Sequence, residues 1–216
     1  HVAIRGIYER NDVGIRKLEG LEKTKGWYEH SVLPKHPESC LTCIVENGIS
    51  YDVDVENGQK TGFFLDQKYN RAAIARIAKG KHVLDCFTHT GSFALNAAKG
   101  GAAHVHAVDI SQTVIDMAQH HADINGLQER MSFETADVFD LLKALKKQPR
   151  VYDMIILDPP AFTKSRETIS HAVKGYREIN TAAMKLLPRG GYLATCSCSH
   201  FMNEGLFKSM LHEAAL

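Results

Sequence analysis

From residue 82 onward, the sequence alternates regularly between short apolar stretches and amphipathic, helix-like stretches. Such alternation is typical of strand–helix–strand units, whose strands lie parallel in one sheet with helices packed on both faces. We therefore predict an α/β fold with a doubly wound, mostly parallel, Rossmann-like sheet. The predicted strands are residues 82–87, 104–109, 131–136, 152–158 and 191–198, and the predicted helices are residues 67–78, 91–99, 111–124, 138–147, 168–187 and 204–215.

The first 60 residues follow a different, strand-rich pattern. Asn47-Gly48 separates two apolar stretches and is a strong signal for a two-residue β-hairpin turn. We predict a small β-rich hairpin region over residues 1–60 and a larger α/β domain over residues 61–216. The chain then stops on a predicted helix, with no closing hairpin.

The pair Cys40-x-x-Cys43 at the start of the predicted hairpin admits two interpretations. It could supply two ligands of a zinc site, but no second Cys or His pair follows at finger-like spacing. On a strand, two residues three apart also point to opposite faces, which is poor geometry for chelation. We therefore favour two small buried residues and predict no metal.

Charge and composition exclude several classes of protein. The chain has 26 basic and 25 acidic residues, so its total charge does not indicate a protein that binds its partners as a polycation. Basic residues do concentrate in residues 60–81 and 161–189, which would suit a phosphate backbone or two solvated helix faces. No apolar run approaches the ~18 residues of a membrane helix, and five cysteines in an ordinary composition indicate reduced thiols. We predict a cytoplasmic protein without a membrane partner.

The predicted strand 152–158 ends abruptly in Asp158-Pro159-Pro160. Pro159 has no N–H, and Pro160 restricts the residue before it, so the strand cannot continue. Asp158 is therefore a carboxylate at the carboxyl edge of the sheet, where doubly wound folds bind ligands. With the aromatic ring of Phe162 nearby in sequence, it predicts a site for a planar, hydrogen-bonding group such as a base. The alternative is an ordinary turn in which the Asp bonds nearby backbone.

Three further acids follow the first three predicted strands, and they indicate a cofactor site. The first strand carries Asp85 and runs into the loop 87–91, which opens a helix in the position where Rossmann-type folds hold their cofactor. Asp109 is placed to accept hydrogen bonds from both ribose hydroxyls of an adenosine. Asp137 could accept one from the adenine amino group. Each acid could instead be a helix N-cap.

The glycine pattern decides which adenosine cofactor fits. Dinucleotides need the fingerprint G-x-G-x-x-G, which is missing here, because backbone must approach the pyrophosphate closely. A cofactor with an amino-acid tail and a sulfonium fits better, so we predict S-adenosylmethionine, with Gln67 or Arg71 holding its carboxylate. The predicted cofactor-binding residues are Gln67, Arg71, Asp85, Phe87, Thr88, Thr90, Gly91, Asp109, Ile110, Asp137, Val138 and Asp158.

Five motifs of the chain resemble one known family. The class I S-adenosylmethionine-dependent cytosine-C5 methyltransferases of bacterial 23S ribosomal RNA are similar to FFLDQKYNR (63–71), VLDCFTHTGSFALNAA (83–98), VDIS (108–111), ILDPPAF (156–162) and TCSCS (195–199). That family usually carries an RNA-binding PUA domain, then a β-hairpin region, then the methyltransferase domain. The resemblance implies that this sequence lacks the PUA domain and the last two sheet strands. It also implies an RNA partner, 23S rRNA or its precursor, which residues 1–60 could contact. We expect a monomer or homodimer.

The resemblance also implies a mechanism. Carbon 5 of cytosine is not nucleophilic, so its methylation requires prior attack at carbon 6, for which a thiolate is suited. The resemblance assigns the nucleophile to Cys198, and within the predicted strand 191–198 only this cysteine stands at the carboxyl end. Asp158 would hold or protonate N3, and the substrate would contact Pro159, Pro160 and Phe162. Related RNA enzymes place a second cysteine where this chain has Ala161.

Three other functions are compatible with parts of this pattern. A related methyltransferase acting on a ring nitrogen of guanine shares the FLD, TGS and DPP motifs but needs no cysteine nucleophile. A nicotinamide oxidoreductase is disfavoured by the missing glycine fingerprint. A non-catalytic RNA-binding module would bind RNA without transferring methyl groups. The cysteine at position 198 discriminates between the first alternative and the cytosine-C5 mechanism.

Overall fold

The computed structural model describes residues 4–149, 151–163 and 165–216. The chain divides into two compact units, His1–Lys68 and Tyr69–Leu216. The sequence had placed this division at residue 60. Each unit is described by itself.

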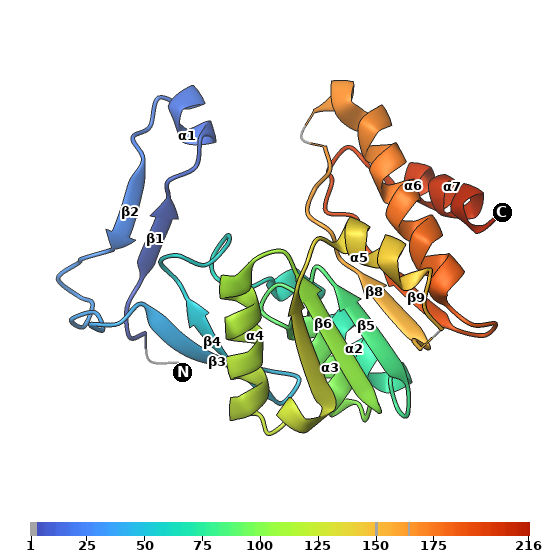
Figure 1. Cartoon of the computed structure of the whole chain (residues 1–216). Coiled ribbons are helices and arrows are strands. Elements are labelled where there is room, and N and C mark those ends of the chain that lie inside the picture. The colour runs from blue at the N-terminus through green and yellow to red at the C-terminus, as the bar shows by residue number, and fades with distance from the viewer. Residues whose placement is uncertain (1–3, 150, 164) are drawn as a thin grey trace. The chain divides into compact units, whose positions relative to one another are not determined.

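The first unit contains two separate antiparallel ribbons (Figure 1). Strands β1 (Tyr8–Asn11) and β2 (Thr24–Trp27) pair around the short helix α1 (Ile15–Leu18). Strands β3 (Leu41–Glu46) and β4 (Ile49–Asp54) form the predicted hairpin. Its turn residues Asn47 and Gly48 have φ of 53° and 73°, the left-handed conformation that a two-residue hairpin turn requires. The short 3-10 helix η1 (Leu65–Gln67) follows.

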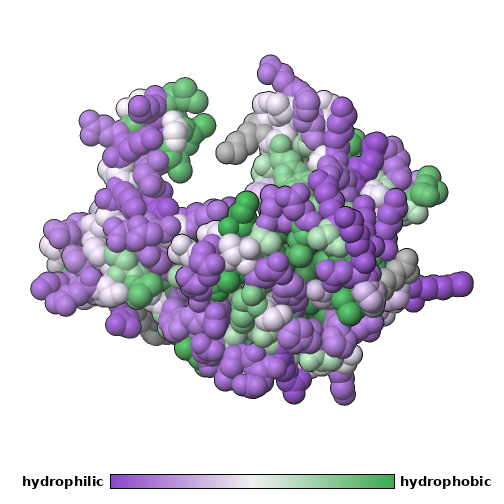
Figure 2. Space-filling view, viewed as in Figure 1, coloured by the Kyte–Doolittle hydropathy of each residue, from purple (hydrophilic) through white to green (hydrophobic). Residues whose placement is uncertain are grey.

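Burial in the first unit is uneven. The side chains of Ile49 and Tyr51 on β4 are completely buried, and Tyr51 packs against Phe63 with ring centroids 4.9 Å apart. Around α1, by contrast, apolar side chains are exposed; Ile15 is 58% and Leu18 is 84% exposed. Figure 2 shows hydrophobic surface gathered at the end of the ribbon where α1 lies. The ribbon of β1 and β2 therefore buries little apolar surface.

The second unit confirms the predicted doubly wound α/β fold. Its sheet has five parallel strands in the order β7-β6-β5-β8-β9 (Figure 1). β5 is the first of these strands in the chain and the central one in the sheet. The chain adds β6 and β7 on one side of β5 and β8 and β9 on the other, so the carboxyl ends of β5 and β8 border a topological switch point. The strands are β5 (His82–Cys86), β6 (His104–Asp109), β7 (Met131–Thr135), β8 (Met154–Leu157) and β9 (Tyr192–Thr195).

Helices cover both faces of this sheet. Leu84 and Cys86 of β5 point into a core formed with α5 and α6. Asp85, between them, points to the other face, where it bonds the backbone of α3. The helices are α2 (Lys68–Ile77), α3 (Ser92–Lys99), α4 (Gln112–Ile124), α5 (Val138–Leu145), α6 (Ile169–Leu186) and α7 (Glu204–Ala215), with the 3-10 helices η2 (Gln128–Arg130) and η3 (Arg166–Thr168).

Two expectations from the sequence are wrong. The last strand was expected to reach residue 198, but β9 ends at Thr195, so Cys196 and Cys198 lie in the loop beyond it. Cys40 and Cys43 were expected to be buried, but Cys40 is only half-buried and Cys43 is exposed, on the same face of β3 as the exposed Leu41 and Val45. Among the described residues, no cluster of three or more potential metal ligands occurs. None of the helices in the described ranges is long and apolar enough to cross a bilayer.

Candidate active site

The loop between β5 and α3 has an unusual backbone. Phe87, His89 and Gly91 have φ of 62°, 51° and 81°, so left-handed residues alternate with ordinary ones over one tight turn. At Gly91 a Cβ atom would lie 2.9 Å from the Cβ of Ala118 in α4, so only glycine fits. The turn brings backbone N–H groups and the first turn of α3 to the carboxyl edge of the sheet.

Asp85 lies beneath this loop and has an orphaned oxygen. Its carboxyl group is 1% exposed, and Oδ2 accepts hydrogen bonds from Thr88 Oγ1 (2.6 Å) and from the N–H of Ala94 (2.9 Å). Oδ1 is buried and has no hydrogen-bond partner among the described residues. Burial, with smaller contributions from Asp158 and Asp109, raises the pKa of Asp85 from 3.8 to about 7.

This arrangement fits the amino-acid tail of the predicted cofactor. A buried carboxylate oxygen without a donor is costly, and a cationic donor such as an ammonium group would satisfy it. S-adenosylmethionine carries such a group on its methionine part. The orphaned oxygen therefore supports the predicted role of Asp85, which itself stays a prediction.

Asp109 lies at the end of the neighbouring strand β6. Its Oδ2 accepts from the N–H of His89 at 3.0 Å, and its Oδ1 accepts from the N–H of Ser111 at 3.1 Å. These two bonds fix the carboxylate at the sheet edge, and each oxygen has a second lone pair for a ribose hydroxyl. Burial lowers the pKa of His89 despite the opposing effect of Asp109. Ile110, which follows Asp109 in the chain, is 70% exposed and presents an apolar surface beside the Asp109 carboxylate.

Asp137 serves as the N-cap of α5. Its Oδ1 accepts from the N–H groups of Phe139 (2.8 Å) and Asp140 (3.3 Å), as the alternative interpretation of this acid expected. The cap orients the carboxylate at the sheet edge, and its predicted bond to adenine stays a prediction. Val138 is 3% exposed and belongs to the core under α5, so only its backbone can face a ligand.

The remaining predicted cofactor residues differ in their settings. Thr90 is 6% exposed, and its carbonyl is 3.0 Å from Nδ1 of the buried His121, which fixes the loop against α4. Arg71 on α2 is 1% exposed, an unusual burial for a guanidinium group. Gln67 lies in η1 and belongs to the first unit. The predicted carboxylate contacts of Arg71 and Gln67 stay predictions.

Asp158 and Cys198 meet at the carboxyl edge of the sheet, beyond the neighbouring strands β8 and β9. Each residue follows its strand, Asp158 after β8 and Cys198 in the loop after β9, and the thiol of Cys198 donates to Asp158 Oδ1 at 3.7 Å. The thiol is exposed and the carboxylate is half-buried. An accessible thiol beside an acid can attack an electrophile and dispose of its proton in the same site.

The three residues predicted to contact substrate lie next to this pair. Pro159 is buried and Pro160 is exposed. The ring of Phe162 is half-buried and packs on Tyr176, with centroids 4.5 Å apart, and on Phe139 at 6.0 Å. Phe162 thus anchors the loop after Asp158 in the core, and its predicted stacking on a base stays a prediction.

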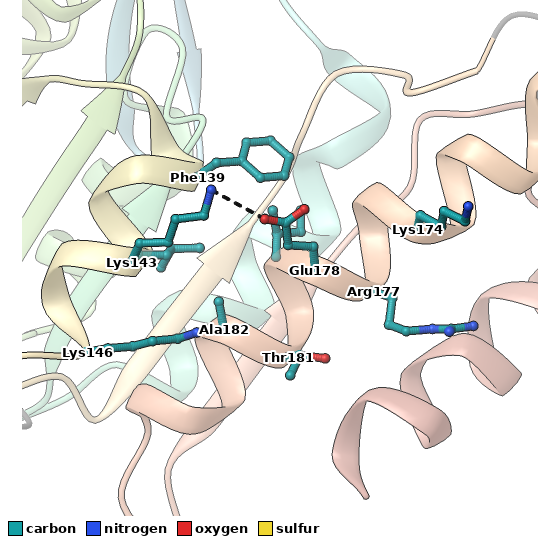
Figure 3. Close-up of a pocket in the computed structure, with 10 residues that line it drawn as sticks. Phe139, Lys143, Lys146, Lys174, Arg177, Glu178, Thr181 and Ala182 are labelled. Atoms are coloured by element: carbon teal, nitrogen blue, oxygen red, sulfur yellow. Dashed lines mark ion pairs between the residues drawn. The ribbon is translucent and has the colours of Figure 1, made fainter.

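A separate hollow lies between α5 and α6, away from the cofactor loop. Figure 3 shows Lys143 and Glu178 facing each other across it, paired at 3.5 Å, while Lys146 extends toward Ala182. Its volume is about 310 Å³. None of the acids or cysteines described above lines this hollow, so it is not part of the candidate site.

A match to a protein family covers most of the chain. The family is described as S-adenosylmethionine-dependent methyltransferase, and it matches residues 33–214. Two curated relatives carry the name ribosomal RNA large subunit methyltransferase I. One, from Shewanella amazonensis, is 46% identical over 97% of this chain, and the other, from Aeromonas salmonicida, is 44% identical over the same share. The chain spans about half the length of these relatives, 52% in both cases.

The solved structures that this chain resembles also include methyltransferases. A methyltransferase from Streptococcus mutans has a TM-score of 0.75 and 30% identity, over 88% of this chain and 48% of that one. Another methyltransferase structure, described as complexed with SAH, matches with the same TM-score and identity over 49% of its length. A methyltransferase from Agrobacterium tumefaciens, at 19% identity and a TM-score of 0.72, supports the fold alone.

These comparisons correct one expectation from the sequence. The motifs had indicated a narrower family, the cytosine-C5 methyltransferases with a PUA domain, and a chain that lacks this domain and the last strands. The matching family is the broader one described above. The relatives are named as large-subunit rRNA methyltransferases, and these names mention neither a PUA domain nor a target base. The narrower assignment is therefore wrong.

Proposed function

Because the chain belongs to the S-adenosylmethionine-dependent methyltransferase family, we propose that it methylates a base of large-subunit ribosomal RNA. S-adenosylmethionine is the cofactor, as the description of the family states. The two relatives named as large-subunit rRNA methyltransferases support the RNA substrate. A protein with this substrate would work in the cytoplasm, where bacterial ribosomes are assembled.

We further propose that the target atom is C5 of a cytosine. The observation that supports this is the contact of 3.7 Å between the Cys198 thiol and Asp158. A guanine-nitrogen methyltransferase needs no nucleophile, whereas C5 of cytosine becomes reactive only after a nucleophile adds to C6. An exposed thiol at the carboxyl edge, beside an acid that can reach a ring nitrogen, is the pair that this reaction requires.

Each residue of the pair has a defined task in the proposed reaction. Asp158 accepts the thiol proton of Cys198. The sulfur then forms a bond to C6, and the C5=C6 π electrons shift through C4 toward N3. Asp158 then delivers that proton to N3, so the ring carries no net negative charge. The bound cofactor supplies the methyl group to C5. Loss of the C5 proton to a base then lets the C6–S bond break, and the N3 proton returns through Asp158 to the leaving sulfur, which regenerates the thiol and the neutral ring.

Asp85, Asp109 and Asp137 would hold the cofactor beside this pair. Asp85 would accept from the ammonium group of the methionine part through its orphaned oxygen, and Asp109 from the ribose hydroxyls. The negative charge of Asp158 contributes to the raised pKa of the Asp85 carboxyl group, so the two side chains are near each other. The cofactor and base subsites would therefore adjoin.

The proposal is tested by substitution and by nucleoside analysis. In Cys198→Ala, methyl transfer from labelled S-adenosylmethionine to large-subunit RNA should fall at least 1,000-fold, roughly the loss when a nucleophile is removed. Asp158→Asn should also lose most activity. The matched control is Cys43→Ala, an exposed cysteine of the first unit, which should retain full activity.

The products discriminate between the candidate functions. Digestion of the methylated RNA should give 5-methylcytidine, and RNA containing 5-fluorocytidine should trap a covalent adduct on Cys198. A methylated guanosine together with full activity of Cys198→Ala would replace the proposal by the guanine-nitrogen alternative. RNA binding with no methyl transfer in any condition would indicate a non-catalytic module.

A further inference from the structure

A buried hydroxyl group lies directly behind the Asp158–Cys198 pair. Ser199 follows Cys198, is 4% exposed, and its Oγ lies 3.0 Å from the hydroxyl of Tyr176 on α6. The same Oγ accepts from the N–H of Thr163 at 3.4 Å. Tyr176 is completely buried and Thr163 is 4% exposed. One hydroxyl therefore joins a helix, the loop that carries Asp158 and the loop that carries Cys198.

This link lies further along both loops than the last backbone bond between the two strands among the described residues. The backbone pairing of β8 and β9 continues as far as the bond from the N–H of Cys196 to the carbonyl of Leu157, at 2.8 Å. Asp158 and Cys198 both lie beyond this bond. The N–H of Asp158 donates to the carbonyl of Cys86 at 3.5 Å, and the Ser199 link adds a second restraint on the 3.7 Å contact from further along both loops.

The neighbours of Tyr176 make this link rigid. Its ring packs on Phe162 at 4.5 Å and edge-on against Phe207 of α7 at 5.7 Å. Thr163 Oγ1 is also engaged, 2.6 Å from Oγ1 of Thr168 at the start of α6. The Tyr176 hydroxyl is thus held by aromatic packing on one side, and the Asp158 loop by hydroxyl contacts on the other.

From this geometry we infer that Tyr176 and Ser199 are positioning residues, which hold the Cys198 thiol against Asp158. The inference rests on the proposed function for its consequence in catalysis. The geometric part stands separately, because the thiol–carboxylate contact can be probed without RNA or cofactor. The link uses none of the residues expected to touch the cofactor.

The test is the pH profile of Cys198 alkylation by iodoacetamide, followed by peptide mass spectrometry in wild type, Tyr176→Phe and Ser199→Ala. A carboxylate beside a thiol opposes formation of the thiolate, so losing the contact moves the profile along the pH axis. Greater exposure alone would multiply the rate by the same factor at every pH. We expect both variants to move toward the profile of Asp158→Asn.

Kinetics provide the second readout. In Tyr176→Phe and in Ser199→Ala, kcat for methyl transfer should fall about tenfold, or 1.4 kcal/mol, while KM for S-adenosylmethionine changes by less than about twofold. The double variant should lose little more than Ser199→Ala alone, because both substitutions remove the Tyr176–Ser199 bond and only Ser199→Ala also removes the bond from Thr163. Losses that simply multiply would contradict a shared role.

The matched control is Tyr152→Phe. Tyr152 also has a partly buried hydroxyl, 2.8 Å from His106 Nδ1, but it lies at the start of β8 and away from the pair. This variant should lose comparable stability in thermal unfolding and keep the wild-type profile and kcat. A wild-type alkylation profile in Tyr176→Phe would overturn the inference. If the profiles move as expected while Cys198→Ala stays active, the proposed function fails and the positioning role stands.

Discussion

At the scale of single residues, Asp85 links cofactor binding to stability. Its carboxyl group is fully buried, and burial raises its pKa from 3.8 to about 7. At about 1.4 kcal/mol for each pKa unit, keeping this group ionised in the folded protein costs roughly 4 kcal/mol. A cationic partner at Oδ1 would offset most of that cost. The ionised Asp85 thus lowers the stability of the cofactor-free protein, and a bound cofactor can offset this cost.

The pH dependence of stability should reveal this cost. An acid whose folded pKa is raised contributes stability that is fully present below pH 3.8 and lost as pH rises through about 7. In urea unfolding without cofactor, wild type should therefore lose up to roughly 4 kcal/mol relative to Asp85→Asn between pH 4 and pH 8. Asp116→Asn, an exposed acid on α4, should show no such trend. Parallel pH curves for wild type and Asp85→Asn would contradict the raised pKa.

The same substitution should weaken cofactor binding. Replacing the carboxylate by an amide removes a charge-assisted bond worth about 1.5–3 kcal/mol, so Kd for S-adenosylmethionine should rise about 10- to 150-fold. Isothermal titration at pH 8 measures this. In wild type, the affinity should also fall as pH drops below about 7, because Asp85 becomes protonated. Equal affinities for the two proteins would exclude Asp85 from the cofactor site.

At the scale of elements, the turn between β5 and α3 and the start of α5 shape the cofactor edge. The turn depends on left-handed residues and on the close approach of Gly91 to α4. Asp137 caps α5 and so fixes where that helix begins. Both features are local, yet each fixes the position of residues that are predicted to bind the cofactor at the sheet edge.

Gly91→Ala should damage both folding and binding. The added Cβ would meet Ala118 at 2.9 Å, and φ of 81° is itself unfavourable for alanine by about 1–2 kcal/mol. We expect a loss of about 2–4 kcal/mol in chemical unfolding and no measurable cofactor binding. Gly126→Ala, with φ of 65° and open space around it, is the matched control and should lose only about 1 kcal/mol. Equal losses in the two variants would show that the contact with α4 is unimportant.

Asp137→Ser separates capping from ligand binding. Serine caps a helix about as well as aspartate, so stability should change by less than about 0.5 kcal/mol, whereas Asp137→Ala should lose about 1 kcal/mol. If the carboxylate also accepts from adenine, the serine variant should bind S-adenosylmethionine several-fold more weakly despite its normal stability. Unchanged affinity in both variants would leave Asp137 as a cap alone.

At the scale of the whole molecule, the two units differ in what holds them together. The second unit has a five-stranded sheet covered by helices, whereas the sheets formed by the described residues of the first unit have two strands each. Isolated ribbons of two strands are marginally stable in water. The only tryptophan of the chain, Trp27, lies on β2 in the first unit and packs edge-on against Tyr8 at 5.1 Å. It therefore reports on the first unit selectively.

Thermal unfolding should resolve the two units. Trp27 fluorescence should change at a lower temperature than the helical circular dichroism signal. At 100 times Kd, S-adenosylmethionine should stabilise the second unit by about 2.7 kcal/mol, which raises its midpoint by several degrees, and leave the Trp27 transition in place. SAH should do the same. Coincident transitions that move together would show that the chain unfolds as one cooperative body.

Local sequence patterns were sufficient to predict most of the architecture. Alternating apolar and helical periods predict the parallel sheet, and Asn47-Gly48 predicts the hairpin, because these patterns depend on neighbours along the chain. The acids at positions 85, 109 and 158 could be placed at one edge for the same reason, since the ends of parallel strands meet there. The narrower family assignment failed, because shared motifs do not by themselves specify the family.

Only the tertiary structure decided the contacts between distant segments. β9 ends three residues before Cys198, and the thiol meets Asp158 through a loop held by Tyr176, which no local pattern indicated. The orphaned oxygen of Asp85 likewise depends on groups from a turn and a helix. The sequence by itself determined which residues stand at the carboxyl edge. Their distances, burial and hydrogen bonds were set by packing between segments far apart in the chain.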